Sequence, residues 1–234
     1  MRRIQNLMEQ WLFIGPDNRQ EQVNLPHTWN AKDGQDGGND YYRGTCHYEK
    51  TFEKPEFDPE AEEVYLEFLG VNASSDVTVN GKELAHHDGG YSTFRINITE
   101  VLEDRNKLEV TVDNSVNGKV YPQKADFTFY GGIYRDVRFL IVSKEHFDLD
   151  YLGSNGIKIT PEVKENEANV HIETFTNTEE AQVNVQIKDQ DGKVVAEGNG
   201  CDVNLNIQNP IRWHGRKNPY LYTAVATLTV NGEV

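Results

Sequence analysis

The amino-acid sequence predicts an all-β protein, and two observations lead to that prediction. Apolar and polar residues alternate in short runs, as in Val64–Phe68, Leu108–Val112 and Val183–Ile187, and this period of two is typical of half-buried antiparallel strands. Asn-Gly or Asp-Gly pairs at 80–81, 117–118, 191–192 and 231–232 separate many of the runs. These pairs tolerate the positive φ values of tight hairpin turns. Only residues 98–105 favour a helix, of one or two turns.

A change in loop character near residues 143–150 predicts a domain boundary. Before it the loops are long and rich in Gly, Asp and Tyr, as in 31–44, whereas after it short strands follow at nearly regular spacing. Residues 1–144 have the size of a jelly-roll sandwich, and residues 145–234 have the size and rhythm of an immunoglobulin-like sandwich. The last strand-like run, Ala224–Val230, is followed by a turn and two residues. Because its returning partner is missing, we expect the sequence to be part of a longer chain.

The composition excludes several classes of function. Lys and Arg number 23 against 38 Asp and Glu, so the formal net charge is −15. A chain this acidic repels nucleic-acid phosphates and anionic membrane surfaces, and no apolar run is long enough to span a bilayer. The N-terminal Arg2–Arg3 pair lacks the apolar stretch of a signal peptide, which leaves the compartment, cytoplasm or periplasm, open.

Residues that commonly bind metals or form disulfides are sparse. Cys46 and Cys201 are 155 positions apart in different predicted domains, so we expect two half-buried free thiols. His86-His87-Asp88 is the one compact group of potential metal ligands. Neighbouring residues of a strand face opposite sides, so an exposed turn is the preferred interpretation and no metal site is predicted.

Two glycine- and aromatic-rich segments are candidates for ligand contact. Residues 126–137 place aromatic residues, paired glycines and charges ahead of a strand. Aromatic faces can pack on sugar C–H groups, and carboxylates accept hydrogen bonds from hydroxyls. We expect Ile133, Tyr134 and Arg135 to be structural, with Arg135 and Asp136 in an ion pair, and Asp126 to be free for binding. Residues 37–44 form the second segment, which suits a binding-site rim or a plain surface loop equally well.

Several motifs resemble glycoside hydrolase family 2, in the order in which that family carries them. They are 25–30 (LPHTWN), 48–52 (YEKTF), 68–82 (FLGVNASSDVTVNGK), 87–94 (HDGGYSTF), 130–137 (YGGIYRDV) and 218–222 (NPYLY). The first five are similar to the family's N-terminal sugar-binding jelly roll. The last looks like the end of its immunoglobulin-like second domain, so the resemblance covers nearly the whole chain.

The resemblance implies a modular, retaining exo-β-glycosidase whose two catalytic glutamates lie in a (β/α)8 barrel after these domains. No catalytic residue is therefore assigned in this chain, which we expect to be inactive alone. The expected partner is an oligosaccharide, bound through the barrel of the parent enzyme. No cofactor is assigned here, although the parent enzyme can use a monovalent or magnesium ion. Family members often form dimers or tetramers, so a homo-oligomer stays open.

In β-galactosidases of the family, an aspartate ahead of the Gly-Ile-aromatic-Arg-Asp motif helps to bind the terminal sugar. Asp126 has the matching spacing, seven residues before Ile133, although Phe127–Phe129 replace the family's usual tryptophan. The loop with Asp40 and Arg43 corresponds to one that approaches the active site. The predicted substrate-binding residues are therefore Asp126, Asp40 and Arg43.

The preferred function is the non-catalytic N-terminal part of a β-galactosidase that hydrolyses terminal β-linked sugars. A β-glucuronidase of the same family is one alternative, although a uronic-acid site needs cations near the sugar carboxylate and the loop 33–40 is acidic. A freestanding carbohydrate-binding β-sandwich is the other. The missing last strand argues against the latter, because an independent module closes its own hairpin.

Overall fold

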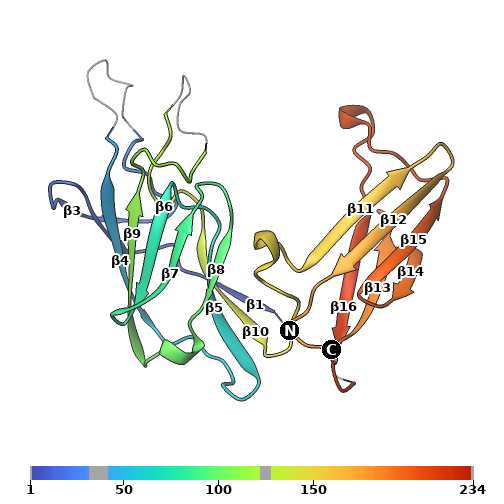
Figure 1. Cartoon of the computed structure of the whole chain (residues 1–234), viewed down its shortest axis with the longest axis horizontal. Coiled ribbons are helices and arrows are strands. Elements are labelled where there is room, and N and C mark those ends of the chain that lie inside the picture. Colours follow the sequence, from blue (N-terminus) through green and yellow to red (C-terminus); the bar gives the residue numbers. More distant parts are fainter. Residues whose placement is uncertain (1, 32–41, 122–127, 233–234) are drawn as a thin grey trace. The chain divides into compact units, whose positions relative to one another are not determined.

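The computed structural model describes residues 2–31, 42–121 and 128–232. Within these ranges the chain forms sixteen strands and three single-turn 3-10 helices, so the all-β prediction is confirmed. It separates into two compact units, Arg2–Lys144 and Glu145–Val234 (Figure 1). No helix in the described part of the chain is long and apolar enough to cross a membrane.

The first unit is a jelly-roll sandwich of two antiparallel sheets. One sheet has the order β1-β10-β5-β8 and the other β3-β2-β4-β9-β6-β7. The strands are β1 (Arg3–Asn6), β2 (Trp11–Ile14), β3 (Gln20–Val23), β4 (Thr45–Glu53), β5 (Glu62–Phe68), β6 (Ser74–Val79), β7 (Lys82–Asp88), β8 (Phe94–Asn97), β9 (Arg105–Asp113) and β10 (Val137–Ser143).

The core of this unit lies between the two sheets and follows the predicted alternation. Val64, Leu66 and Phe68 of β5 are fully buried, and Leu108, Val110 and Val112 of β9 are at most 1% exposed. The aromatic rings of Trp11 and Tyr48 fill the centre in an edge-to-face arrangement, with centroids 6.5 Å apart. A large apolar area is thereby removed from water, which is the main source of stability for a sandwich of this kind.

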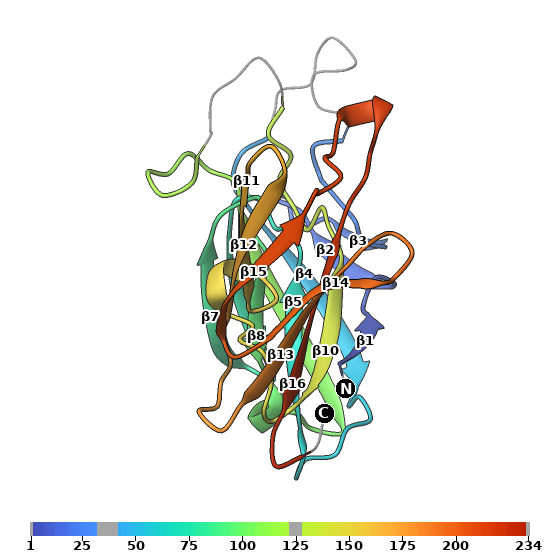
Figure 2. The ribbon, with the colours of Figure 1, turned by 90° about the vertical axis from the view of Figure 1, so that its right-hand side faces the viewer.

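The second unit is a smaller, immunoglobulin-like sandwich of two three-stranded sheets, ordered β11-β12-β15 and β14-β13-β16. Its strands are β11 (Ile157–Val163), β12 (Glu167–Thr174), β13 (Gln182–Lys188), β14 (Val194–Asn199), β15 (Asp202–Gln208) and β16 (Thr223–Thr229). Alternate residues of β12, β13 and β15 point inward and form one core of nine buried side chains. Figure 2 shows these strands from a second direction.

The predicted turns occur with one exception. Asn80 and Gly81 join β6 to β7 with φ values of 51° and 77°, and Gly192, in the β13–β14 connection, has a φ of 80°. Asn231 and Gly232 also have positive φ. Asn117-Gly118 is different, because it lies in the long β9–β10 connection and forms no hairpin.

The expected one or two helical turns in residues 98–105 occur as a single 3-10 turn, η1 (Thr99–Val101). Two further expectations were wrong. His86-His87-Asp88 lies at the end of β7 and not in a turn. Cys46 is completely buried in the core and Cys201 is exposed, so neither thiol is half-buried. In each case the packing of distant segments, and not the local pattern, decides the outcome.

Candidate functional site

The candidate site lies where the strands of the jelly roll end and the long loops begin. Thr45, at the start of β4, pairs with Asp113 at the end of β9. Asp113 also pairs with Ser74, which opens β6 and faces Asp88 at the end of β7. Phe68, the last residue of β5, pairs with Val137, the first residue of β10. We call this edge of the sandwich, with the segments that enter and leave it, the loop end.

The segment Phe129–Asp136 connects the loops of this edge. Gly132 and Asn72 exchange two main-chain hydrogen bonds of 3.0 Å, and the Asn72 side chain donates to the carbonyl of Tyr130 at 2.8 Å. Tyr134 donates to the main-chain carbonyl of Gly90, and Arg135 donates to those of Leu69 and Tyr91. The segment therefore ties the β5–β6 and β7–β8 connections together.

A buried cluster of amides joins two loops, the β3–β4 and β9–β10 connections. The Asn30 side chain is fully buried. Its Oδ1 accepts from the Gly131 N–H at 2.8 Å and from Asn114 Nδ2 at 3.4 Å, and its Nδ2 donates to the Tyr42 carbonyl at 3.0 Å. Asn114 Oδ1 accepts from the Gly44 N–H at 2.9 Å. Buried amides have to be hydrogen-bonded, so this cluster holds residues 30, 42–44 and 131 in one arrangement.

The paired glycines are required by close packing in this cluster. Gly132 has a φ of 126°, and a Cβ there would lie 2.7 Å from the His27 carbonyl oxygen and from Tyr48 Oη. A Cβ on Gly131 would lie 2.2 Å from Cζ2 of Trp29. His27 Nδ1 and Tyr48 Oη are 2.8 Å apart, and burial lowers the pKa of His27, which favours the neutral imidazole.

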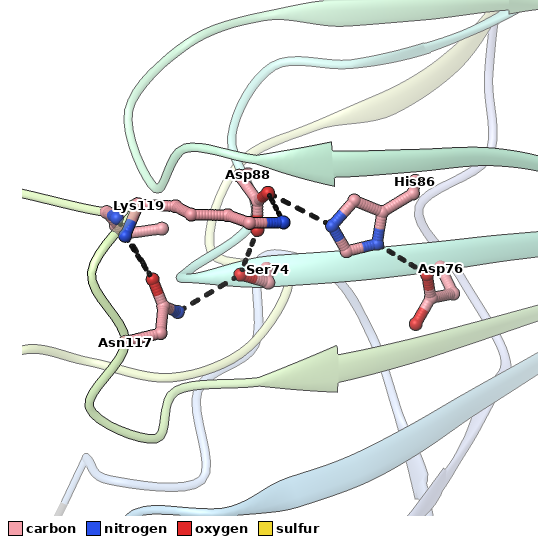
Figure 3. A network of polar contacts seen from close by, with 7 residues as sticks. Ser74, Asp76, His86, Asp88, Asn117 and Lys119 are labelled. Atoms are coloured by element: carbon pink, nitrogen blue, oxygen red, sulfur yellow. Dashed lines mark hydrogen bonds and ion pairs between the residues drawn. The ribbon is translucent and has the colours of Figure 1, made fainter.

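A second polar network joins β6, β7 and the chain that follows β9 (Figure 3). The Asp88 carboxylate accepts from Ser74 Oγ at 2.7 Å and pairs with Lys119 Nζ at 3.0 Å and His86 Nε2 at 3.1 Å. His86 Nδ1 lies 2.6 Å from Asp76 Oδ1. The imidazole is thus placed between two carboxylates, one on β6 and one on β7.

The network also holds the chain that follows β9. Asn117 donates to Ser74 Oγ at 3.3 Å, and its own Oδ1 accepts from the main-chain N–H groups of Lys119 and Val120. Hydrogen bonds from Ser74, Lys119 and His86 lower the pKa of Asp88, whereas those to Asp76 and Asp88 raise the pKa of His86. The carboxylate and the imidazolium therefore stabilise each other, and residues 117–120 are attached to β6 and β7.

Of the predicted substrate-binding residues, Asp126 and Asp40 lie outside the described residues. The Arg43 guanidinium lies over the Phe129 ring, 5.8 Å from its centroid, so it connects the segment before β4 to the segment before β10. Ile133 is fully buried. Arg135 donates to carbonyls of neighbouring loops and stacks on Tyr134. Both Arg135 and Asp136 belong to the described part of the chain and form no ion pair with each other there, so the expected pair was wrong.

Sequence reasoning did not identify Asn30, Asn72 or Asn114 as site residues. Asn30 ends the 25–30 motif and Asn72 lies in the 68–82 motif, so these motifs could have pointed to both residues. Asn114 lies in none of the motifs. The described residues contain no group of three or more His, Cys, Asp or Glu that could hold a metal ion. What the described loop end provides is a rigid base for the two loops that leave it.

Both units match models of domains from one known protein family. Residues 38–148 match a family model described as a glycosyl hydrolase 2 galactose-binding domain-like domain, and residues 154–234 match the model for glycosyl hydrolases family 2. The chain belongs to glycoside hydrolase family 2. Both expected domains, the galactose-binding-like jelly roll and the immunoglobulin-like sandwich, are therefore present in the expected order.

Named relatives within family 2 include enzymes of two specificities. A β-glucuronidase of Bacteroides fragilis is 34% identical over 90% of this chain and 33% of its own length. A β-galactosidase of Thermoanaerobacter pseudethanolicus is 28% identical over the whole chain and 34% of its own. The crystal structure of an FMN-binding β-glucuronidase from Faecalibacterium prausnitzii L2-6 superimposes with a TM-score of 0.91 at 39% identity, over 100% of this chain and 38% of that one. The chain spans about a third of the length of the curated relatives that it matches.

Proposed function

We propose that this chain is the non-catalytic N-terminal part of a retaining exo-β-glycosidase. The observation that carries the proposal is the order of the two family 2 domains, 38–148 and then 154–234, in a chain that spans about a third of its relatives. A retaining glycosidase needs two carboxyl groups about 5–5.5 Å apart on either side of the glycosidic bond. In this proposal both belong to the remaining part of the parent enzyme.

The role proposed for the jelly roll is to form one wall of the sugar-binding site. The amide cluster around Asn30 and Asn114 supports this role, because it fixes the bases of the loops that contain Asp40 and Asp126. Asp126 and Asp40 would accept hydrogen bonds from sugar hydroxyls, and Arg43 would hold the two loops together through Phe129. Preorganised side chains of this kind contribute to catalysis by orienting the substrate.

For the substrate, we propose a terminal β-glucuronide. Of the three relatives described above, the two with the higher identities, 34% and 39%, are both named β-glucuronidases. The preference for a β-galactosidase, drawn from the sequence, becomes the second candidate, and the 28% identical β-galactosidase favours it. The cations that a uronic acid requires would then come from the remainder of the parent enzyme or from Arg43.

The test is to clone the coding sequence that continues beyond Val234 and to assay the parent on p-nitrophenyl β-glucuronide and β-galactoside. We expect hydrolysis of the glucuronide with a β-configured first product by NMR, and no turnover by the 234-residue chain. Turnover of the galactoside alone selects the second candidate. A reading frame that stops within one strand's length refutes the enzyme role and favours a freestanding sugar-binding protein.

A further inference from the structure

A groove crosses one sheet of the jelly roll at the end opposite to the loop end. Its volume is about 810 Å³, which is within the range of about 300–1,000 Å³ that small-molecule sites occupy. It lies where β4 ends at Glu53 and β9 begins at Arg105, whereas the loop end contains Thr45 and Asp113 of the same two strands. The neighbouring strands β3, β2, β4 and β9 all contribute lining residues, so the groove runs across the sheet.

The groove presents polar side chains whose hydrogen-bonding groups are free. Gln22 on β3, Thr51 and Glu53 on β4, and Arg105 on β9 line it and are all exposed. Within the described ranges, none of these four side chains forms a hydrogen bond or an ion pair. They offer an amide, a hydroxyl, a carboxylate and a guanidinium, so the groove can both donate and accept hydrogen bonds.

The apolar lining residues of the groove are buried or half-buried, and its charged residues balance. The apolar residues are Leu12, Val23 and Phe52. The charged residues are two carboxylates and two cations, namely Glu49, Glu53, Lys50 and Arg105. A strongly charged ligand finds no excess of opposite charge in such a groove. The ligand that fits is therefore uncharged, with apolar faces and many hydrogen-bonding groups.

One wall of the groove, around Gln10, is held by hydrogen bonds before any ligand binds. Gln10 has a φ of 57°, and its N–H donates to Asn24 Oδ1 at 2.9 Å. Lys50 Nζ donates to the carbonyl of Glu9, the preceding residue, at 2.7 Å. A wall that is already fixed loses little further entropy when a ligand is ordered against it.

We propose that this groove binds an uncharged oligosaccharide through about two or three sugar units, the size of ligand that such a volume accommodates. The apolar residues would pack against the C–H faces of the sugar rings. The free amide, hydroxyl and carboxylate would form hydrogen bonds with the sugar hydroxyls. Binding here requires only the 234-residue chain, so it goes beyond the proposed function and does not depend on it.

A peptide fits the groove less well than a sugar chain. Peptides that bind to sheets commonly add to a free strand edge, where the main chain supplies the hydrogen bonds. This groove runs across four strands instead, and its free hydrogen-bonding groups belong to side chains.

The experiment titrates the ¹⁵N-labelled 234-residue chain with cellohexaose and with xylohexaose, two uncharged oligosaccharides, and follows the main-chain amide signals by NMR. We expect the largest shifts at Gln10, Gln22, Thr51 and Glu53. For at least one of the two sugars we expect a Kd on the order of 1 mM.

A pair of double variants separates the groove from the rest of the surface. Gln22→Ala with Glu53→Ala should weaken binding roughly fivefold or more, because two hydrogen-bonding groups are lost. Gln5→Ala with Glu56→Ala is the matched control, since it removes an exposed amide and an exposed carboxylate of the same unit outside the groove. The control should leave the Kd unchanged. Circular dichroism and urea denaturation verify that both double variants fold.

Three results overturn the proposal. The first is that neither sugar shifts the groove signals at about 10 mM, well above the expected Kd, including the case in which a neutral polar hexapeptide shifts them instead. The second is that the sugar shifts only residues 42–44 and 131, because it then binds at the loop end. The third is an equal loss of affinity in the groove variant and in the control.

Discussion

Glu67 offers the sharpest test of how the jelly roll is held together. Its side chain on β5 is fully buried, which is rare for a carboxylate. Oε1 lies 2.7 Å from Arg95 Nε, and Oε2 accepts a hydrogen bond from Arg138 Nε. Arg2 lies 3.6 Å away, and the Arg95 side chain is itself only 4% exposed. We predict that Glu67→Ala severely destabilises this unit.

The magnitude follows from the partners that the substitution leaves behind. Removing one member of a buried ion pair typically costs about 3–5 kcal/mol, because the remaining charge stays buried without compensation. Here three guanidinium groups, those of Arg2, Arg95 and Arg138, lose their common counter-charge. The loss compares with a total stability of about 5–15 kcal/mol for a native domain. Glu67→Gln keeps the side-chain volume and removes only the charge, so it should cause most of the destabilisation that Glu67→Ala causes.

The assay is urea denaturation of the isolated chain, followed by tryptophan fluorescence, to which the buried Trp11 contributes, and by circular dichroism. Glu109→Ala is the control, since Glu109 pairs with Lys107 at the surface and Lys107 keeps Glu49 at 3.2 Å. It should cost about 0–1 kcal/mol. The reasoning would be refuted if Glu67→Ala lowered the free energy of unfolding by less than about 1 kcal/mol while the slope of that free energy against urea concentration stayed unchanged.

Three further outcomes follow from particular residues. Gly132→Ala should cost about 2–4 kcal/mol in urea denaturation, through its positive φ and the contacts of a new Cβ, whereas Gly118→Ala, with open space around it, should stay within about 0.5 kcal/mol. His86 has a raised pKa, so the stability it contributes is fully present below about pH 6.5 and is lost as the pH rises through its folded-state pKa. The stability difference between wild type and His86→Gln should therefore be larger at acidic than at alkaline pH, within about 1 kcal/mol for an exposed pair, and an equal difference at both would contradict this. Burial raises the pKa of Cys46 to about 12, so iodoacetamide at neutral pH should label only the exposed Cys201 until denaturant is added, as counted by mass spectrometry.

The part of the fold that local patterns control could be predicted well. The alternating runs in β5, β9, β13 and β15 all formed strands with the expected inward faces. A strand's two faces are set by its period of two, and a hairpin such as Asn80-Gly81 is set by the φ preferences of two residues. The family motifs added the order of the two sandwiches and the expectation that catalysis lies elsewhere.

What the sequence by itself determined, then, is the set of strands, their buried faces and the family. Only the tertiary structure decided which residues meet at the loop end. Asn30 contacts Asn114 from 84 positions away and Gly131 from 101, and Glu67 meets Arg138 from 71. No local period encodes such pairs. A buried polar group has to find its partner in whichever segment the packing of the sheets brings beside it, and for the same reason His86 lies in a strand between two carboxylates and not in a turn.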